Sequence, residues 1–239
     1  MPTKITGRPQ SPSLPLMTSS STSEGLDLGS VIDAPGAEEY VWVKNGATAV
    51  VPGKLYQSSA PVANHQNLTC TAAAVGATQV TVTLGATAAT ENQYQNGKLI
   101  INAGTGAGQT LLIKYNPAAA LSTAMVVTLE DPLLIALDGT SKACLTANKC
   151  NGVILNPATA TDSSVGFGIY PIPAGEYGWL MKKGVVSGLA DGAISAGAQI
   201  SASNAVAGAV ESGVAGQASI GRAKIAGVDT EYRPIEVML

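Results

Sequence analysis

The glycine pattern Gly104-x-Gly106-x-Gly108, which follows an apolar segment, is the strongest candidate in this chain for a phosphate-binding loop. A dinucleotide-binding fingerprint needs a helix directly after the glycines, because the N-terminus of that helix binds the pyrophosphate. Here β-branched and apolar residues follow at 110–115, and the third glycine comes only two positions after the second. We therefore predict a glycine-rich hairpin turn between strands at 98–101 and 110–115, and no nucleotide site.

The single histidine, His65, is the residue on which any Ser–His–Asp catalysis would depend. It lies in a polar stretch, and the chain has no Gly-x-Ser-x-Gly nucleophile turn, so we interpret it as a surface or loop histidine. The adjacent pairs Glu38-Glu39 and Glu130-Asp131 are the other acid–base candidates. Neighbouring residues of a strand point to opposite faces, so these carboxylates would not converge on one substrate bond. We interpret them as solvated charges.

Three cysteines are present, at Cys70, Cys144 and Cys150. An odd number, together with no apolar segment of a secretory signal after Lys4 and Arg8, argues against a disulfide framework. One histidine and scattered cysteines also cannot build a zinc site. We expect small buried thiols, no metal and no cofactor, and the sequence leaves open whether Cys144 and Cys150 are bridged.

The composition excludes several classes of protein. Of the 239 residues, 46% are hydrophobic but only 4% are aromatic and 12% charged, and the net charge is −3. Coiled coils and helical bundles need more charged residues and leucine, and a nucleic-acid binder is normally basic. No apolar run approaches the roughly 20 residues of a membrane helix. We therefore expect neither nucleic acid nor membrane as a partner.

Trp42, Trp179 and the seven tyrosines allow two interpretations. They could form a platform on which sugars stack, or they could be the large side chains that fill cores otherwise built of Ala and Val. We favour the core. Such a core buries little apolar area per residue, so contacts with other subunits or with a large assembly are expected to add stability.

Alternating residues indicate that strands dominate the chain. Residues 79–84 alternate strictly, with Val80, Val82 and Leu84 on one face. Asn45-Gly46 indicates a turn, and 118–124 is a weak candidate for a short helix. Further strands are expected at 40–43, 49–51, 55–56, 98–101, 110–115, 125–129, 133–137, 185–186, 198–200, 218–220, 223–225 and 235–239. We predict an all-β fold of sandwich or barrel modules with short strands and Gly-rich turns.

Changes in composition suggest three segments: an extended N-terminal arm (1–36), a β-rich main domain (37–178) and a small C-terminal barrel-like module (179–239). The arm is rich in Pro, Ser and Thr, and such a segment cannot fold alone. No acidic residue precedes Glu24, so the arm is locally basic. The arm residues expected to bind a partner are Lys4, Arg8, Leu14, Leu16 and Met17.

A family resemblance begins at Tyr94. The segments YQNGKLIINAGTGAGQTLLIKY, VVTLEDPLLIALDGTS and AGEYGWLMKKGVVSGLADGAISAGAQISAS, followed by SIGRAKIAG and IEVML, resemble structural head proteins of tailed bacteriophages. The similarity is greatest to the decoration, or cement, proteins of the outer capsid surface. It covers about residues 39–239 and consists of a similar residue pattern and a similar order of motifs, not of a catalytic signature.

The resemblance implies a protein without enzymatic activity. It implies binding to the major capsid protein at local threefold positions, often as a homotrimer, and reinforcement of the shell of a virion assembled in the host cytoplasm. The arm would then be a tether to the capsid. The alternatives are another virion component, such as a head fibre, a tail protein or the major capsid protein itself; a cell-surface sugar-binding adhesin; or an enzyme. The adhesin lacks an expected secretion signal, and the enzyme lacks a convergent acid, base and nucleophile.

Overall fold

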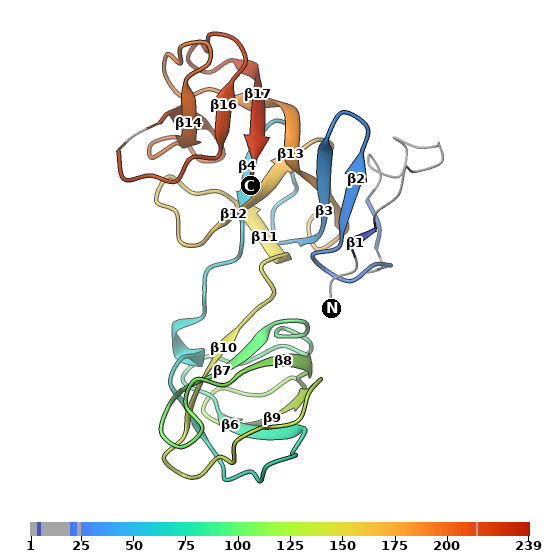
Figure 1. The fold of residues 1–239 in the computed structure, drawn as a ribbon, viewed down its shortest axis with the longest axis vertical. Coiled ribbons are helices and arrows are strands. Elements are labelled where there is room, and N and C mark those ends of the chain that lie inside the picture. Colours follow the sequence, from blue (N-terminus) through green and yellow to red (C-terminus); the bar gives the residue numbers. More distant parts are fainter. Residues whose placement is uncertain (1–3, 6–19, 23–24, 214) are drawn as a thin grey trace. The chain divides into compact units, whose positions relative to one another are not determined.

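The computed structural model describes residues 4–5, 20–22, 25–213 and 215–239, and the statements below refer to these residues. Strands make up the fold, and the helical structure described is one short 3-10 helix, η1 (Ala63–His65) (Figure 1). The prediction of an all-β fold is confirmed.

The chain divides into two compact units. The first comprises residues 1–60 and 149–239, and the second is the continuous insertion 61–148. The first unit contains β1 (Lys4–Ile5), β2 (Val31–Ala34), β3 (Glu38–Asn45), β4 (Leu55–Gln57), β11 (Asn151–Leu155), β12 (Ser164–Gly168), β13 (Tyr177–Leu189), β14 (Gln199–Ala202), β15 (Val210–Ser212), β16 (Gly221–Ala223) and β17 (Tyr232–Met238). The second contains η1, β5 (Leu68–Cys70), β6 (Gln79–Thr83), β7 (Lys98–Ala103), β8 (Thr110–Tyr115), β9 (Ala124–Leu129) and β10 (Lys142–Thr146).

These units do not coincide with the segments expected from composition. The expected boundary at 178/179 falls inside β13, a strand of 13 residues. Its first half pairs with β3 and its second half with β17. The change to Gly/Ala-rich sequence does not interrupt β13, because the ladder is held by backbone hydrogen bonds that glycine and alanine also make.

The second unit is a closed barrel with the strand order β10-β5-β6-β9-β8-β7. As predicted, Val80 and Val82 share the buried face of β6, and Leu84, directly after the strand, is also buried. The predicted hairpin of 98–101 and 110–115 is also present, with Leu99 opposite Leu111. In the first unit the expected strands at 49–51 and 218–220 do not form, since Val50 makes only an isolated bridge. Two expectations for the second unit are also wrong. Residues 133–137 form only an isolated bridge, and 118–124 contains a turn and the start of β9 instead of a helix.

In the first unit, two sets of paired strands each close into a circuit. β3 pairs with β11 and also with β13, which closes the circuit β3-β11-β4-β12-β13. The second half of β13 continues into β17-β16-β14-β15, and a parallel bridge joins Ala190, directly after β13, to Val210 of β15. Each unit has its own hydrophobic cluster, with Phe167 and Leu180 fully buried in the first and Ile113 and Val127 in the second.

The arm expected over residues 1–36 is too long, because its last residues belong to the folded first unit. Leu28 is buried, and β2 forms a hairpin with β3 whose turn uses Gly36 (φ 90°) and Ala37 (φ 61°). The apolar residues Val31 and Ile32 pack against the first core, so this part does bury enough surface to be ordered. Lys4 lies in β1, which pairs in parallel with β2. The other expected binding residues, Arg8, Leu14, Leu16 and Met17, lie outside the described residues.

Candidate functional site

Three connections of the barrel lie at one end, which we call the loop end. Every neighbouring pair of barrel strands is antiparallel, so successive connections alternate between the two ends. The connections 71–78, 104–109 and 130–141 therefore share the loop end. The segments 61–67 and 147–148, through which the chain enters and leaves the barrel, lie at the opposite end.

The glycine motif forms the turn of the β7–β8 hairpin at the loop end. Gly104, Gly106 and Gly108 all have positive φ, at 75°, 80° and 94°. A Cβ on Gly106 would lie 2.8 Å from Cδ2 of Leu137, and one on Gly104 would overlap the carbonyl of Thr140. The predicted hairpin turn is confirmed, and two of its glycines let the turn pack closely against the connection 130–141.

Two segments, 73–77 and 133–137, lie antiparallel to each other at the loop end. The Ala73 and Leu137 amides each donate to the other residue's carbonyl, at 3.0 and 2.8 Å, and the Leu133 amide donates to the Ala77 carbonyl at 2.9 Å. A turn at 75–76 lies between these two points of contact, and the Gly76 amide donates to the Leu133 carbonyl at 2.8 Å. Leu133 and Leu137 are buried in the barrel core, so they fix both ends of the second segment.

Gln109 holds the middle of that second segment. Its Oε1 accepts hydrogen bonds from the amides of Leu134 (3.1 Å) and Ile135 (3.0 Å). Its Nε2 donates to the carbonyl of Ile135 at 3.0 Å and to that of Gly106 at 3.2 Å. One side chain thus satisfies backbone groups that a neighbouring strand would otherwise pair, which explains why the predicted strand does not form.

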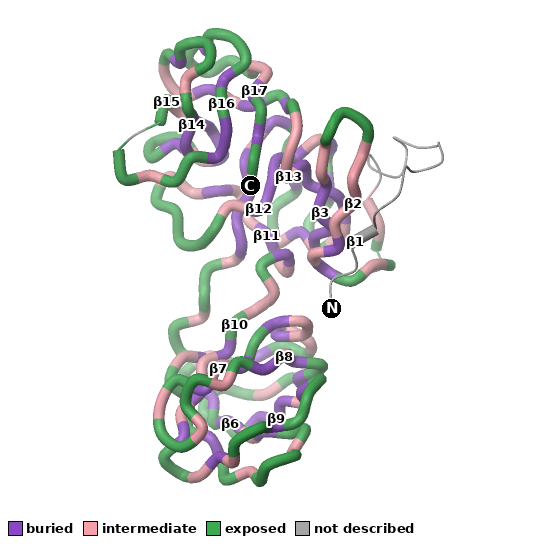
Figure 2. Tube along the Cα trace, viewed as in Figure 1, coloured by how far each residue is buried: buried purple, intermediate pink, exposed green. Residues whose placement is uncertain are grey.

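The result is an exposed group of aliphatic side chains, Val75, Leu134 and Ile135, which we call the apolar tip. Their exposed fractions are 63%, 78% and 50%. Figure 2 shows these connections of the barrel largely as exposed tube. Exposed apolar patches on a rigid surface commonly mark sites of protein interaction.

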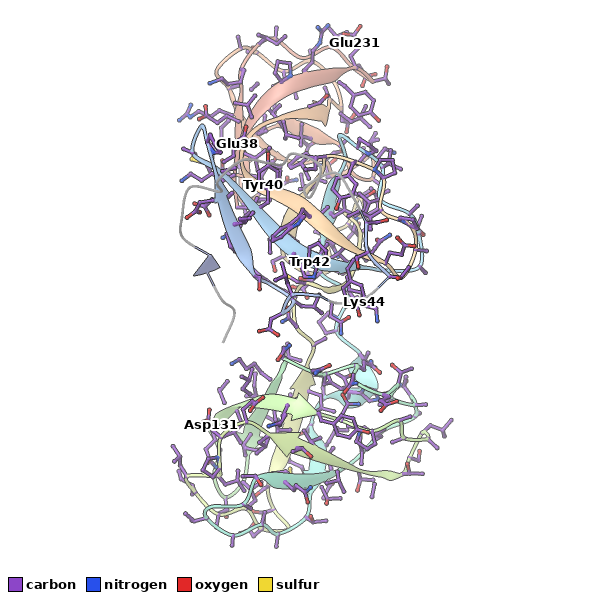
Figure 3. All side chains as sticks on the ribbon, turned by 90° about the vertical axis from the view of Figure 1, so that its right-hand side faces the viewer. Glu38, Tyr40, Trp42, Lys44, Asp131 and Glu231 are labelled. Atoms are coloured by element: carbon purple, nitrogen blue, oxygen red, sulfur yellow. The ribbon has the colours of Figure 1, made fainter. Side chains whose placement is uncertain are left out.

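Acidic residues flank the apolar tip in sequence. Glu130 and Asp131 precede it, both exposed, and Glu130 also lies 3.6 Å from Lys114. Figure 3 labels Asp131 on the barrel. Asp138 follows the tip and accepts hydrogen bonds from the hydroxyls of Thr105 and Thr140, both at 2.6 Å. These bonds lower the pKa of Asp138 to about 2, so it stays ionised at neutral pH.

His65 is buried, so its interpretation as a surface histidine is wrong. Its Nδ1 is hydrogen-bonded to the Tyr94 hydroxyl, and its Nε2 lies 2.9 Å from the carbonyl of Thr87. Both ring nitrogens are therefore used in holding η1 against the connection 84–97. The neighbouring Asn64 and Gln66 are not buried, and these polar neighbours hid the burial of His65 in the sequence.

None of the three cysteines forms a disulfide, so Cys144 and Cys150 are not bridged. Cys70 and Cys150 are buried, as predicted, and burial raises the pKa of each thiol to about 11. Cys144 is half-buried, and its sulfur accepts a hydrogen bond from the Asn67 amide at 3.4 Å.

The two tryptophans lie in the core, as predicted. Trp42 and Trp179 are paired across β3 and β13, with ring centroids 5.0 Å apart and exposed fractions of 6% and 5%. Tyr177 stacks beside Trp42 at 6.4 Å. Figure 3 labels Trp42 on β3 between Tyr40 and Lys44. A sugar-stacking platform needs open ring faces, and these two indoles do not offer them.

A pocket of about 550 Å³ lies in the first unit. Its lining is mostly small polar and aliphatic side chains, with Asp162 as its only side-chain carboxylate. In the part of the chain that the structure describes, no cluster of His, Cys, Asp or Glu is suited to hold a metal ion, and no helix is long and apolar enough to cross a membrane.

Comparisons with models of protein families, with curated proteins and with solved structures find no match to this chain.

Proposed function

We propose that this chain is a structural virion protein that binds the outer surface of a tailed-phage capsid and stabilises the shell. Its partner is the major capsid protein, and it associates with itself as a homotrimer on the shell. The observation that carries the proposal is the apolar tip, whose three aliphatic side chains are 50–78% exposed on hydrogen-bonded connections. The resemblance of residues 39–239 to decoration proteins supports the same function.

The physical mechanism is linkage between binding and shell stability. A protein that binds the assembled shell, and not its separated subunits, stabilises assembly by mass action. Burial of the apolar tip contributes roughly 25 cal/mol for each Å² of apolar surface removed from water. Each contact is modest, and repetition over many equivalent capsid sites makes the total large.

The N-terminal segment contributes a second contact in this proposal. Lys4 and Arg8 supply positive charge, and Leu14, Leu16 and Met17 supply apolar anchors. A truncation that removes residues 1–19 also removes β1, but it leaves Ser21, which is bridged to Tyr177, and the β2–β3 hairpin in place. We expect the truncated protein to bind undecorated heads more weakly than the full chain. Equal occupancy and equal resistance to dilution would contradict the tether.

Copurification with intact heads tests the function itself. We expect the protein to sediment with heads at a fixed ratio to the capsid protein, and to raise the temperature at which heads release their DNA. Sedimentation with isolated tails or fibres in place of heads would favour another virion component. Absence from all virion fractions would contradict the proposal.

A further inference from the structure

The apolar tip is held in its exposed conformation before any partner arrives. Gln109 makes four hydrogen bonds to backbone groups there, two of them to the amides of Leu134 and Ile135. The close packing of Gly104 and Gly106 against residues 136–140 restricts the same connection. A preorganised surface loses little conformational entropy on binding, so more of its contact energy is available for affinity.

The charges around the tip restrict what can cover it. Glu130, Asp131 and Asp138 flank the tip in sequence, and Lys114, within 3.6 Å of Glu130, is the cation paired there. The hydrogen bonds to Asp138 favour its ionised form. Two tips facing each other would bring like charges together, which costs free energy. A second copy of the same surface is therefore a poor occupant, and a surface that carries Lys or Arg around an apolar depression is a good one.

We propose that the loop end of the barrel is the face that docks on the shell, with the apolar tip inserted into an apolar depression of the major capsid protein bordered by basic side chains. This inference rests on the proposed function. The chain enters and leaves the barrel at the opposite end. The apolar side chains supply the affinity, and the acidic residues orient the approach.

The first test replaces the apolar tip in the full chain. The double variant Leu134→Ser, Ile135→Ser removes both exposed side chains and leaves the buried Leu133 and Leu137 unchanged. The matched control is Leu121→Ser, which is 57% exposed in the connection 116–123 at the opposite end of the barrel. In a titration of undecorated heads, we expect the double variant to bind about tenfold more weakly or worse, as for central interface residues. The control should bind like the unchanged protein.

The second test changes charge without changing the apolar tip. Asp131 is exposed, so Asp131→Lys should fold as the unchanged protein does, and circular dichroism and the melting temperature check this for each variant. We expect Asp131→Lys to weaken binding at low salt, and the loss to shrink as added salt screens the interaction. Because this variant leaves the aliphatic side chains in place, it tests the docking face even if the double serine variant fails to fold.

The outcomes separate the inference from the proposed function. If the unchanged protein does not bind heads, the proposed function fails and the inference fails with it. If the unchanged protein binds and both tip variants bind equally well, the docking face is wrong while the function stands. An equal loss in the Leu121→Ser control would also overturn the assignment to the loop end.

Discussion

Asp138 joins two connections of the loop end through its carboxylate. It accepts hydrogen bonds from Thr105 of the hairpin turn and from the amide and hydroxyl of Thr140 in its own connection. These bonds favour the ionised carboxylate and lower its pKa from 3.8 to about 2. Since the pKa is lower in the folded protein, the stabilisation is present above about pH 4 and is lost as the pH falls toward 2.

Thr105→Val tests this link, because it removes the largest contribution to the low pKa. We expect the pKa of Asp138 to rise toward 3.8, and the amides of Leu134 and Ile135 to exchange faster below pH 4 than in the unchanged protein. NMR titration of the carboxyl group and hydrogen exchange measure the two effects. A pKa that does not move would show that Thr105 is not the controlling partner.

The thiols give a prediction about reactivity. The thiolate is the reactive form, and burial raises the pKa of Cys70 and Cys150 to about 11. Cys144 is only half-buried. In native protein at pH 8, we expect iodoacetamide to alkylate Cys144 first, and the other two only after unfolding. Mass spectrometry of tryptic peptides locates the modification, and early labelling of Cys150 would contradict the buried position.

Two glycines in the turn of the β7–β8 hairpin should differ in how much an alanine substitution destabilises the protein. Gly104 and Gly108 both have positive φ, but a Cβ on Gly104 meets the backbone of Thr140 while one on Gly108 has nothing within 4 Å. Gly108→Ala should therefore lower the free energy of unfolding by only about 1 kcal/mol, because alanine disfavours a positive φ. Gly104→Ala should lower the free energy of unfolding by clearly more, because the connection 130–141 must also move. Urea unfolding of both variants measures the difference, and equal losses would mean that the turn does not pack as described.

Local sequence pattern predicts the structure correctly in two parts of the barrel. Alternation located β6 and its buried face, and the glycine spacing located the β7–β8 turn. It failed at 133–137, where consecutive apolar residues predicted a strand. The backbone partner there is the Gln109 side chain, more than 20 residues earlier, and no local pattern reveals it. The apolar tip was missed for this reason, although an unbroken Leu-Leu-Ile run between acidic residues was a visible signal.

The same limit applies to His65 and to the domain boundaries. Burial of His65 depends on Tyr94, which is 29 residues away in sequence. The limits of the inserted barrel are set by the pairing of β10 with β5, whose paired residues are more than 70 positions apart. No change in composition marks these limits. Such long-range pairings become visible only when the strands are placed in three dimensions.

For the whole molecule, the inserted barrel is expected to be an independent folding unit. Residues 61–148 form a closed barrel with a hydrophobic cluster of their own. We therefore expect this fragment, produced alone, to show a β-type circular dichroism spectrum and a cooperative thermal transition. A broad, non-cooperative melt would show that the barrel depends on the first unit.

We propose that this protein covers a phage shell from the outside. Electron cryomicroscopy of heads with and without added protein tests it most directly. We expect extra density on the outer surface at repeated sites in groups of three, with the loop end of the barrel facing the capsid protein. Heads that show no added density at saturating protein, or density confined to the tail, would contradict it.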